Sequence, residues 1–484
     1  MTPSPATSPR HRPGLTLLTT GFGTLLVLID YTAPLTTLTP NAAALRMGPS
    51  AQTWVLTGTL VGLAALLLTM GSAADDYGRK RVFGAGAVLL LISTLLSALA
   101  PDTAVFLAGR ILQGCAAAAI LAPTLGLIGN VYPAGPARVK ALGRWSASIG
   151  LGIATGPIYA AFLEDAGGWR TVYAVLAALS AVLILLTAYG LDESGTARPR
   201  KLDPFGVVTL AAGSSCLVAG LAEGRDGWGR APVLILLVVG VLFLVGFAVV
   251  ECRVAEPMLD VTLFRNSGFV ASSAGALFTG LSIVGLMSYL PTVLQKSLGE
   301  TSLTASLVLA IWSGLSVVSA LQARRLAGVA ATTQVAGSLL VCGIGEAALL
   351  GLHVGSSWTH LVPGLVIAGI GSGILNAALA RLAVGSVPSH RAAMGSGANN
   401  SFRYLGSALG VAIVATVVSQ ATSPRGPAYA MADGANRATA VTALLCAIGA
   451  TVALWARIAG ARATADGPSD SGRTASPAFD TTGS

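Results

Sequence analysis

Apolar runs separated by polar connections occupy nearly the whole of this chain. A helix needs about twenty mostly apolar residues to cross the hydrocarbon core of a bilayer. Fourteen runs of about that length lie near residues 15–38, 53–74, 82–100, 104–131, 140–163, 170–190, 204–222, 231–251, 268–292, 302–321, 333–353, 360–385, 394–420 and 438–459. The pattern predicts an all-α polytopic membrane protein with 14 transmembrane helices.

The two ends of the chain lack this pattern. Residues 1–13 are rich in Thr, Pro and Ser, and residues 461–484 in Ser, Thr, Gly and Asp. Such compositions are typical of disordered segments, which cannot bury a core. No small-residue cleavage site follows the first apolar run, so we expect a retained helix there rather than a signal peptide.

The composition supports the membrane class. Hydrophobic residues make up 54% of the chain and charged residues 10%, whereas soluble domains carry roughly 25% charged residues. The 59 glycines suit helices that pack closely in lipid. The five cysteines share no short spacing, so the sequence indicates neither a metal site nor a disulfide framework.

Basic residues are distributed unevenly over the two faces that fourteen helices would create. The face with both termini has 19 Lys or Arg in its connections, and the other face has 7. Cytoplasmic loops carry the excess of such residues. We therefore expect a protein of the cell membrane with both termini in the cytoplasm. This bias also explains the net charge of +9 without a nucleic-acid partner.

A faint internal repeat suggests two related halves. Ala141-Leu142-Gly143 opens the fifth predicted helix and Ala393-Met394-Gly395 the thirteenth, each after a Gly-rich helix. Many transporters consist of such repeats, with the substrate site near the midplane between them. The segments we expect are two six-helix bundles (14–191 and 268–460), two additional helices (204–252) and two cytoplasmic linkers (192–203 and 253–267).

Asp30 and Arg110 lie inside the apolar runs of the first half. Ionised groups are costly in a membrane and mark ion or substrate pathways. Asp30 could take up a proton on one side and release it on the other, or exchange it for a cationic substrate. The alternative is a structural partner for a neighbouring helix. Arg110 cannot readily lose its proton, so it must be paired or hydrated. It either switches partners during a cycle or holds a static ion pair.

The second half has its own charged residues. Glu346 is the only acid inside its apolar runs, and it is either a second coupling or cation-recognition site or a group that reaches interfacial water. Arg403 is a similar candidate. Arg381, near the end of a predicted helix, can extend its guanidinium to the cytoplasmic interface. Trp312, Met287, Tyr289 and Phe278 could line a drug pocket, although packing against lipid would explain them equally well.

A compact turn joins the second and third predicted helices. It contains Gly71, Asp75, Gly78, Arg79 and Lys80. An Asp at a helix end can cap a neighbouring helix and pair with Arg, so we expect a cytoplasmic latch that stabilises one access state. The alternative is that the basic cluster only sets the topology.

The fifth predicted helix contains Gly143, Gly152, Gly156 and Pro157. Glycine permits close packing, and proline removes a helical hydrogen bond and bends the helix. Such a helix suits the rocking of two halves, although membrane helices are commonly rich in glycine.

The energy source can be narrowed by what the sequence lacks. It contains no Gly-x4-Gly-Lys-Ser/Thr phosphate loop, so we expect no nucleotide cofactor, and the proton motive force remains. Four histidines and few membrane acids offer no clustered catalytic or metal-binding set, so we expect a protein that is not an enzyme.

Six segments together resemble the major facilitator superfamily, and more narrowly its fourteen-helix drug:proton antiporter branch. The resembling segments are the loop Gly71–Arg81, the fourth-helix signature Arg110–Gly114, the fifth-helix antiporter signature Gly143–Pro157, the first-helix acidic signature Asp30–Thr32, the second-helix opening Gln52–Val55 and the linker Glu256–Arg265. The family uses the arginine of its fourth helix in proton coupling, and the Gly-Pro motif accompanies export rather than import.

The resemblance also has departures. Asp76 stands where an Arg is usual, and Ala160 and Ala161 replace a glycine pair. Leu35 and Thr59 stand where the branch often has Asn and Tyr. These differences bear on substrate specificity more than on fold.

The resemblance implies a proton-coupled exporter of hydrophobic or cationic drugs or antibiotics that works by alternating access and as a monomer. Its partners would be the drug, protons and the lipid bilayer. Two alternatives stay open, namely a transporter of another small solute, such as a nutrient, siderophore or amino acid, and a membrane receptor or scaffold that does not transport.

Overall fold

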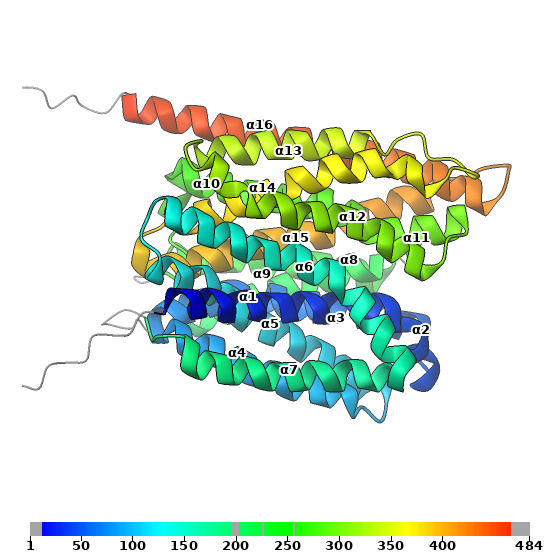
Figure 1. Ribbon diagram of the computed structural model, residues 1–484, viewed down its shortest axis with the longest axis horizontal. Coiled ribbons are helices and arrows are strands. Elements are labelled where there is room, and N and C mark those ends of the chain that lie inside the picture. Colours follow the sequence, from blue (N-terminus) through cyan, green and yellow to red (C-terminus); the bar gives the residue numbers. More distant parts are fainter. Residues whose placement is uncertain (1–11, 195–202, 225–226, 255–256, 466–484) are drawn as a thin grey trace, which may run out of the picture.

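The computed structural model describes residues 12–194, 203–224, 227–254 and 257–465, and every regular element in this part of the chain is a helix. The first half of the chain forms α1 (Pro13–Thr32), α2 (Pro34–Ala44), α3 (Pro49–Tyr77), α4 (Arg79–Ala98), α5 (Thr103–Val131), α6 (Pro136–Gly167) and α7 (Trp169–Gly190). The long helices run side by side along the longest axis of the molecule (Figure 1). The start of α1 lies at the same end as the end of α16 (Pro427–Ala465).

The rest of the chain adds nine helices, α8 to α16, and five short helical segments, η2 to η6. The bounds of α16 are given above. The others are α8 (Pro204–Glu223), α9 (Ala231–Glu251), η2 (Val261–Arg265), α10 (Ser267–Phe278), η3 (Thr279–Val284), α11 (Gly285–Leu298), α12 (Ser302–Leu321), η4 (Ala323–Leu326), α13 (Ala331–Ala347), η5 (Trp358–Leu361), α14 (Val362–Gly385), η6 (Ser389–Arg391) and α15 (Ala392–Ser419).

Thirteen helical segments of the described residues are long and apolar enough to cross a membrane, with α10, η3 and α11 counted as one. The remaining predicted span corresponds to α13, which has 17 residues. The predicted all-α membrane class is therefore confirmed, and the predicted count of fourteen agrees with the structure when α13 is included.

The observed helices differ from the apolar runs in local detail. The first run divides at Ala33, because Pro34 has no N–H to donate and begins α2. The ninth run contains a π-helical stretch, η3, in its middle. The last helix begins at Pro427 and continues to Ala465, so residues 461–465 are helical rather than part of a tail. The predicted tails at 1–11 and 466–484, and most of the linker 192–203, lie outside the described residues.

Buried apolar side chains form two main clusters. One is built almost entirely from α1 to α7 and the other from α10 to α16. The helices α8 and α9 pack against each other, and α8 also contacts α3 and α15, where Val218 and Leu221 join a smaller apolar cluster. Few residues of α9 are buried, so α8 stands between α9 and the two large clusters.

Candidate functional site

An ion pair joins α1 and α5 in the interior of the first half. Arg110 Nη1 lies 3.3 Å from Asp30 Oδ1, and the two side chains are 0% and 2% exposed. The same nitrogen donates to the Asp30 carbonyl at 3.1 Å. The structure thus brings together two of the four predicted intramembrane charges, which are eighty residues apart in the sequence.

Neutral groups also hold the arginine. Arg110 Nη1 donates to Gln113 Oε1 at 2.6 Å, and Arg110 Nε donates to the Val55 carbonyl at 3.2 Å. Arg110 Nη2 is buried and has no hydrogen-bond partner among the described residues. The guanidinium is therefore fixed by groups that cannot titrate, and one of its nitrogens is left for a second partner.

Close helix packing places this arginine. A Cβ on Gly62 of α3 would meet the Ile111 carbonyl, and one on Gly114 of α5 would meet the Thr59 carbonyl. Only glycine allows α3 and α5 to cross at this distance. The crossing brings Val55 within reach of the guanidinium, and the Thr59 hydroxyl donates to the Arg110 carbonyl at 3.3 Å.

A cavity of about 200 Å³ lies between the two main clusters. Its lining includes Tyr31 and Thr32, which follow Asp30 in α1, and Leu56, which follows the Arg110 partner Val55 in α3. Helices from both clusters and α8 form its walls. The remaining lining residues are Leu35, Leu56, Thr57, Leu60, Ile153, Pro157, Val218, Leu221, Ala222, Val284, Met287, Ser288, Tyr289, Thr292, Leu309, Trp312, Ala408 and Val411.

The lining of this cavity is apolar with scattered hydroxyl groups. Among the described residues that line it, none is Asp, Glu, Lys, Arg or His. Of the four side chains suggested from the sequence, Trp312, Met287 and Tyr289 belong to the lining, whereas Phe278 does not. Sites for small organic molecules are mostly apolar with a few placed polar groups, and this cavity has that character.

The indole of Trp312 is fixed by a hydrogen bond to α14. Its Nε1 donates to Ser372 Oγ at 3.0 Å, and that hydroxyl donates to the Ala368 carbonyl at 2.7 Å. The ring is only 6% exposed. A fixed aromatic ring offers a substrate a flat apolar surface with little loss of side-chain entropy.

The predicted Gly-Pro helix, α6, packs between α1 and α12. A Cβ on Gly152 would meet Leu28, and one on Gly156 would meet the Thr32 hydroxyl, whereas one on Gly143 would meet the Ala320 carbonyl of α12. Pro157 itself lines the cavity. The helix α6 therefore contacts the cavity, the helix α1 that carries Asp30, and α12 in the second half of the molecule.

The predicted turn between α3 and α4 contacts the beginning of α15. The Asp75 carboxylate accepts hydrogen bonds from Ala393 N at 3.1 Å and Met394 N at 2.7 Å. It also pairs with Arg79 Nη2 at 2.7 Å, and both side chains are buried. The side chain of the N-cap residue Arg391 does not cap α15, so Asp75 satisfies N–H groups that lack a partner at a helix start.

Arg79 extends the same contact. Its Nη2 donates to the Ser389 carbonyl at 2.9 Å, and its Nη1 to the Gly126 carbonyl at 3.2 Å. Gly71 lies beneath the contact, because a Cβ there would meet the Ala393 carbonyl. These residues, Gly71, Asp75 and Arg79 with Ser389 and the first turn of α15, are named the latch below.

Gly78 and Lys80 face the end of α7 rather than α15. Gly78 has a φ of +115°, which favours glycine, and Glu193 packs against it. Lys80 donates through its N–H to Glu193 Oε1 and through Nζ to the Ala188 carbonyl. The predicted turn thus divides into a part that contacts the second half and a part that contacts the first.

Glu346 lies at the end of α13, away from the ion pair. It is 0% exposed, and neither carboxylate oxygen has a hydrogen-bond partner among the described residues. Thr442 and the Cys446 thiol lie beside it, and that thiol contacts Ser282 Oγ of η3 at 3.1 Å. A charge buried without a partner is costly, so this carboxyl has the character of a proton-binding group.

Arg403 and Arg381 occupy two other places. Arg403 lies on α15 next to Tyr404, and its Nε is buried without a hydrogen-bond partner in the part of the chain described. Neither Arg403 nor Glu346 lines the central cavity. Arg381 lines a separate cleft at the end of the molecule that carries the latch.

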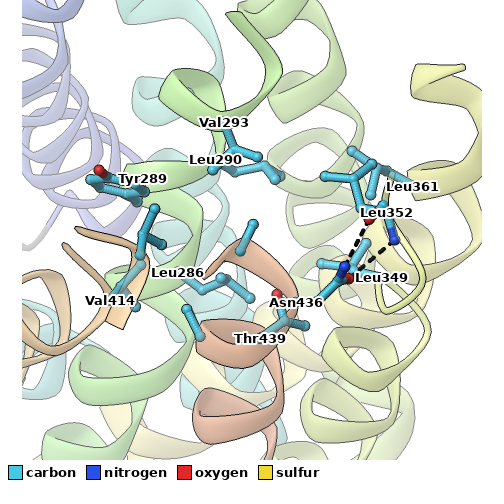
Figure 2. A pocket seen from close by; sticks show the side chains of 13 residues that line it. Leu286, Tyr289, Leu290, Val293, Leu349, Leu352, Leu361, Val414, Asn436 and Thr439 are labelled. Atoms are coloured by element: carbon cyan, nitrogen blue, oxygen red, sulfur yellow. Dashed lines mark hydrogen bonds between the residues drawn. The ribbon is translucent and has the colours of Figure 1, made fainter. Parts of the chain in front are cut away.

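The second half also contains a small void of about 20 Å³. Figure 2 shows leucines of α11 and of the chain after α13 around it, with Asn436 at its edge. Asn436 accepts from Gly351 N and Leu352 N and donates to the Leu352 carbonyl, so its amide holds the chain between α13 and α14. The void has room for about one water, and we assign it no substrate.

Within the described residues, no group of three or more His, Cys, Asp or Glu side chains is placed to hold a metal ion.

What sequence reasoning missed is the contribution of α8 to the cavity. Its residues Val218, Leu221 and Ala222 line the cavity. All three are apolar, and the sequence alone does not distinguish an apolar residue that faces a cavity from one that faces lipid.

Comparison with known proteins identifies the family to which this fold belongs. The family model described as "Major Facilitator Superfamily" matches residues 20–411. The puromycin resistance protein pur8 of Streptomyces alboniger is 32% identical over 422 residues, which is 86% of this chain and 83% of that protein. The multidrug resistance protein Stp of Mycobacterium tuberculosis is 28% identical over 407 residues, 84% of this chain and 76% of that protein.

Solved structures agree on the fold. The human organic anion transporter MFSD10 superposes with a TM-score of 0.66 at 18% identity, covering 91% of this chain and 99% of that one. With the family match over most of the chain, the pattern of membrane helices and this likeness of fold, the chain belongs to the Major Facilitator Superfamily and is a multi-pass membrane transporter.

Proposed function

We propose that this protein exports drugs or antibiotics in exchange for protons. The observation that carries the proposal is the buried Asp30–Arg110 pair, whose neighbours along α1 and α3, Tyr31 and Leu56, line the cavity. A titratable pair next to a substrate cavity can couple the occupancy of one to the charge of the other. The relatives named for puromycin and multidrug resistance support the choice of substrate.

The proton step would use Asp30. When Asp30 binds a proton, its attraction to Arg110 weakens, while Gln113 and the Val55 carbonyl continue to hold the guanidinium. Asp30 and α1 can then move relative to α5 without leaving Arg110 wholly unpaired. Because Gly152 and Gly156 of α6 pack on α1 around Leu28 and Thr32, such a movement would reach the cavity wall.

The two clusters of buried apolar residues would be the moving halves, which is how we interpret the segments 14–191 and 268–460. The latch joins these halves at the end that carries both described termini. We place this end in the cytoplasm on the excess of basic residues there. The structure would then correspond to a state closed toward the cytoplasm.

The substrate we expect is an amphipathic molecule with apolar and hydrogen-bonding parts. The cavity offers hydroxyls, aromatic rings and a fixed indole but no carboxylate, so a positive charge on the drug would find aromatic faces there and no negatively charged partner. Within the range of hydrophobic or cationic drugs, the lining therefore favours the hydrophobic compounds.

A direct test uses an efflux-deficient bacterium expressing this chain, challenged with a panel that contains puromycin, neutral polyketides and ethidium. We expect raised resistance to the uncharged compounds and energy-dependent efflux that a protonophore abolishes. Efflux that survives the protonophore would argue against proton coupling. If the expressing cells are as sensitive to every compound of the panel as cells without this chain, at good membrane expression, the result would favour a transporter of another small solute.

A further inference from the structure

Glu346 is a buried acid that the proton step on Asp30 does not use. Its side chain lies on α13 and is 0% exposed, and neither carboxylate oxygen has a hydrogen-bond partner among the described residues. The ion pairs found in that part of the chain do not involve it. An ionised carboxylate in such surroundings is costly, so the packing around Glu346 suits the protonated acid.

The elements packed on α13 bring no charge to Glu346. These elements are α10, η3, α14 and α16. Neither α10 nor η3 contains a charged residue, and Arg381 of α14 lies at the latch end. The charged residues with described side chains on α16 and the histidines of the chain before α14 are all exposed: Asp433, Arg437, Arg457, His353 and His360.

Two hydrogen-bond donors of α16, Thr442 and Cys446, lie beside the carboxyl. Both donate elsewhere in this structure. The Thr442 hydroxyl donates to the Thr439 carbonyl at 3.1 Å, and the Cys446 thiol donates to Ser282 Oγ at 3.1 Å. Hydrogen bonds to an ionised acceptor are stronger than those to a neutral one. Both donors would therefore turn to the Glu346 carboxylate if it lost its proton.

The bond from Cys446 connects this acid to the cavity wall. Its acceptor, Ser282, belongs to the π-helical segment η3, and the last residue of that segment, Val284, lines the cavity. A Cβ on Gly280 of η3 would meet the Arg403 carbonyl of α15, so η3 is closely packed there. Helical segments with π geometry often occur at functional sites. Loss of the Cys446 bond would free one side of η3.

A second connection runs through Cys342 to the cavity. Cys342 precedes Glu346 by four residues on α13, so the two side chains share a helix face. Its thiol lies 3.6 Å from the Ala368 carbonyl and 3.7 Å from Ser372 Oγ. Ser372 Oγ is the acceptor that fixes the indole of Trp312 in the cavity lining. A thiol that turned toward Glu346 would change the surroundings of this acceptor.

The small void drawn in Figure 2 lies one helical turn from Glu346. Leu349 follows Glu346 by three residues, Thr439 precedes Thr442 by three, and Leu349 and Thr439 both line the void. Asn436 adds an amide at its edge. A void of this size has room for about one water, and its hydroxyl and amide would hydrogen-bond that water. The void thus offers a place where a proton can leave the acid.

We propose that Glu346 is a second proton-binding site, and that its charge is sensed at the cavity through Trp312 and η3. When its O–H bond breaks, the proton passes to water at the void, and the carboxylate accepts from Thr442 and the two thiols. Ser372 and Ser282 then lose their thiol contacts. The effect on substrate rests on the proposed function, whereas proton binding at Glu346 does not.

The first test is infrared difference spectroscopy between low and high pH on the full-length protein in lipid nanodiscs. A protonated carboxyl has a C=O stretching band that a carboxylate lacks. We expect a band that disappears as the pH rises in the wild type and in Asp30→Asn and that is missing from Glu346→Gln. Glu346→Asp should show the band at a changed frequency. A spectrum of folded Glu346→Gln equal to that of the wild type would overturn the proposal.

A further variant serves if Glu346→Gln does not fold. Thr442→Val removes one donor to the carboxylate, so we expect Glu346 to hold its proton about tenfold more tightly than in the wild type. Thr451→Val is the matched control, because the Thr451 side chain is exposed on the same helix, and the pH at which its band disappears should not change. Equal behaviour of the two valine variants would contradict the proposed role of the Thr442 hydroxyl.

The second test records tryptophan fluorescence of the same samples as a function of pH. We expect a pH-dependent change in the wild type, in Asp30→Asn and in Trp455→Phe, which alters an exposed tryptophan of α16. The change should be lost in Trp312→Phe and in Glu346→Gln. If either of these two variants keeps the full change, the connection between Glu346 and the cavity is wrong. Neither test measures transport, so a failure of Asp30 coupling would leave both outcomes unaffected.

Discussion

At the scale of single residues, the sequence identified the charges but not their partners. Asp30 and Arg110 stand out because each interrupts an apolar run, yet nothing in the sequence joins positions eighty residues apart. Burial decides what such a pair can do, because a charge without water depends on its protein neighbours. Arg110 has Gln113 and the Val55 carbonyl as partners besides Asp30, so under the proposed mechanism its guanidinium would stay hydrogen-bonded when Asp30 binds a proton.

The cavity can be tested at Trp312. The change Trp312→Phe keeps an aromatic ring but removes the donor to Ser372 Oγ. Without this bond the ring is no longer fixed, and ordering it again on binding would cost at most about the 0.5–1.5 kcal/mol that a buried hydrogen bond contributes, so we expect apparent substrate affinity to fall by roughly two- to tenfold with little change in maximal rate. Concentration-dependent transport in inverted vesicles measures both.

The matched control is Trp455→Phe, because this tryptophan is 65% exposed on α16. Its kinetics should equal those of the wild type. Equal losses in the two variants would mean that Trp312 acts through general stability rather than through the cavity.

At the scale of helices, most elements followed from the sequence because a membrane span has a length and composition that few other segments share. The exceptions have local physical causes. Pro34 divides the first span, and η3 interrupts the ninth with π-helical geometry. The latch was predicted as a cap of a neighbouring helix, but the identity of that helix, α15, depends on the tertiary arrangement. Its functional role stays a prediction.

The packing of α6 on α1 gives a prediction at this scale. In Gly156→Ala the new methyl group would overlap the Thr32 hydroxyl, which must turn away, and would lie 3.2 Å from Thr32 Cβ and 3.3 Å from Ile29 Cα, so α1 and α6 must also shift apart slightly next to the cavity. Overpacking of this kind costs about 1–3 kcal/mol. We expect the transport rate to fall at least tenfold in folded, membrane-inserted protein.

Gly246→Ala provides the comparison, since nothing lies within 4 Å of a Cβ built at Gly246 of α9. We expect normal expression and transport from it. Wild-type rates in Gly156→Ala would show that this close contact is not needed during the cycle.

The latch gives a second prediction for the elements. Asp75→Asn keeps the shape of the side chain but removes the charge that pairs with Arg79 and caps α15. Hydrogen bonds to charged groups contribute about 1.5–3 kcal/mol, so the closed state should lose roughly ten- to a hundredfold in relative population.

Labelling of Ser396→Cys by a membrane-impermeant maleimide in inverted vesicles, in a background without the native cysteines, reports this opening. Ser396 is buried between α15 and α5 in the closed state. We expect faster labelling with Asp75→Asn than without it. The exposed change Asp165→Asn should have no effect, and equal labelling rates in all three backgrounds would remove Asp75 from the latch.

At the scale of the whole molecule, the fold was predictable and the substrate cavity was not. Fourteen apolar runs define the class, and the uneven distribution of basic residues predicts its topology. The cavity forms only when α1, α2, α3, α6, α8, η3, α11, α12 and α15 meet. The apolar side chains of α8 illustrate the limit, since in the sequence they resemble the lipid-facing residues of α9.

The central claim is that a proton on Asp30 drives the export of substrate from the cavity. It is tested most directly in proteoliposomes, by measuring the accumulation of an identified substrate under an imposed pH gradient with wild-type protein and with Asp30→Asn. We predict gradient-driven accumulation by the wild type. The variant should still exchange substrate down its concentration gradient, with no response to pH. Accumulation by Asp30→Asn that follows the pH gradient as in the wild type would contradict the account.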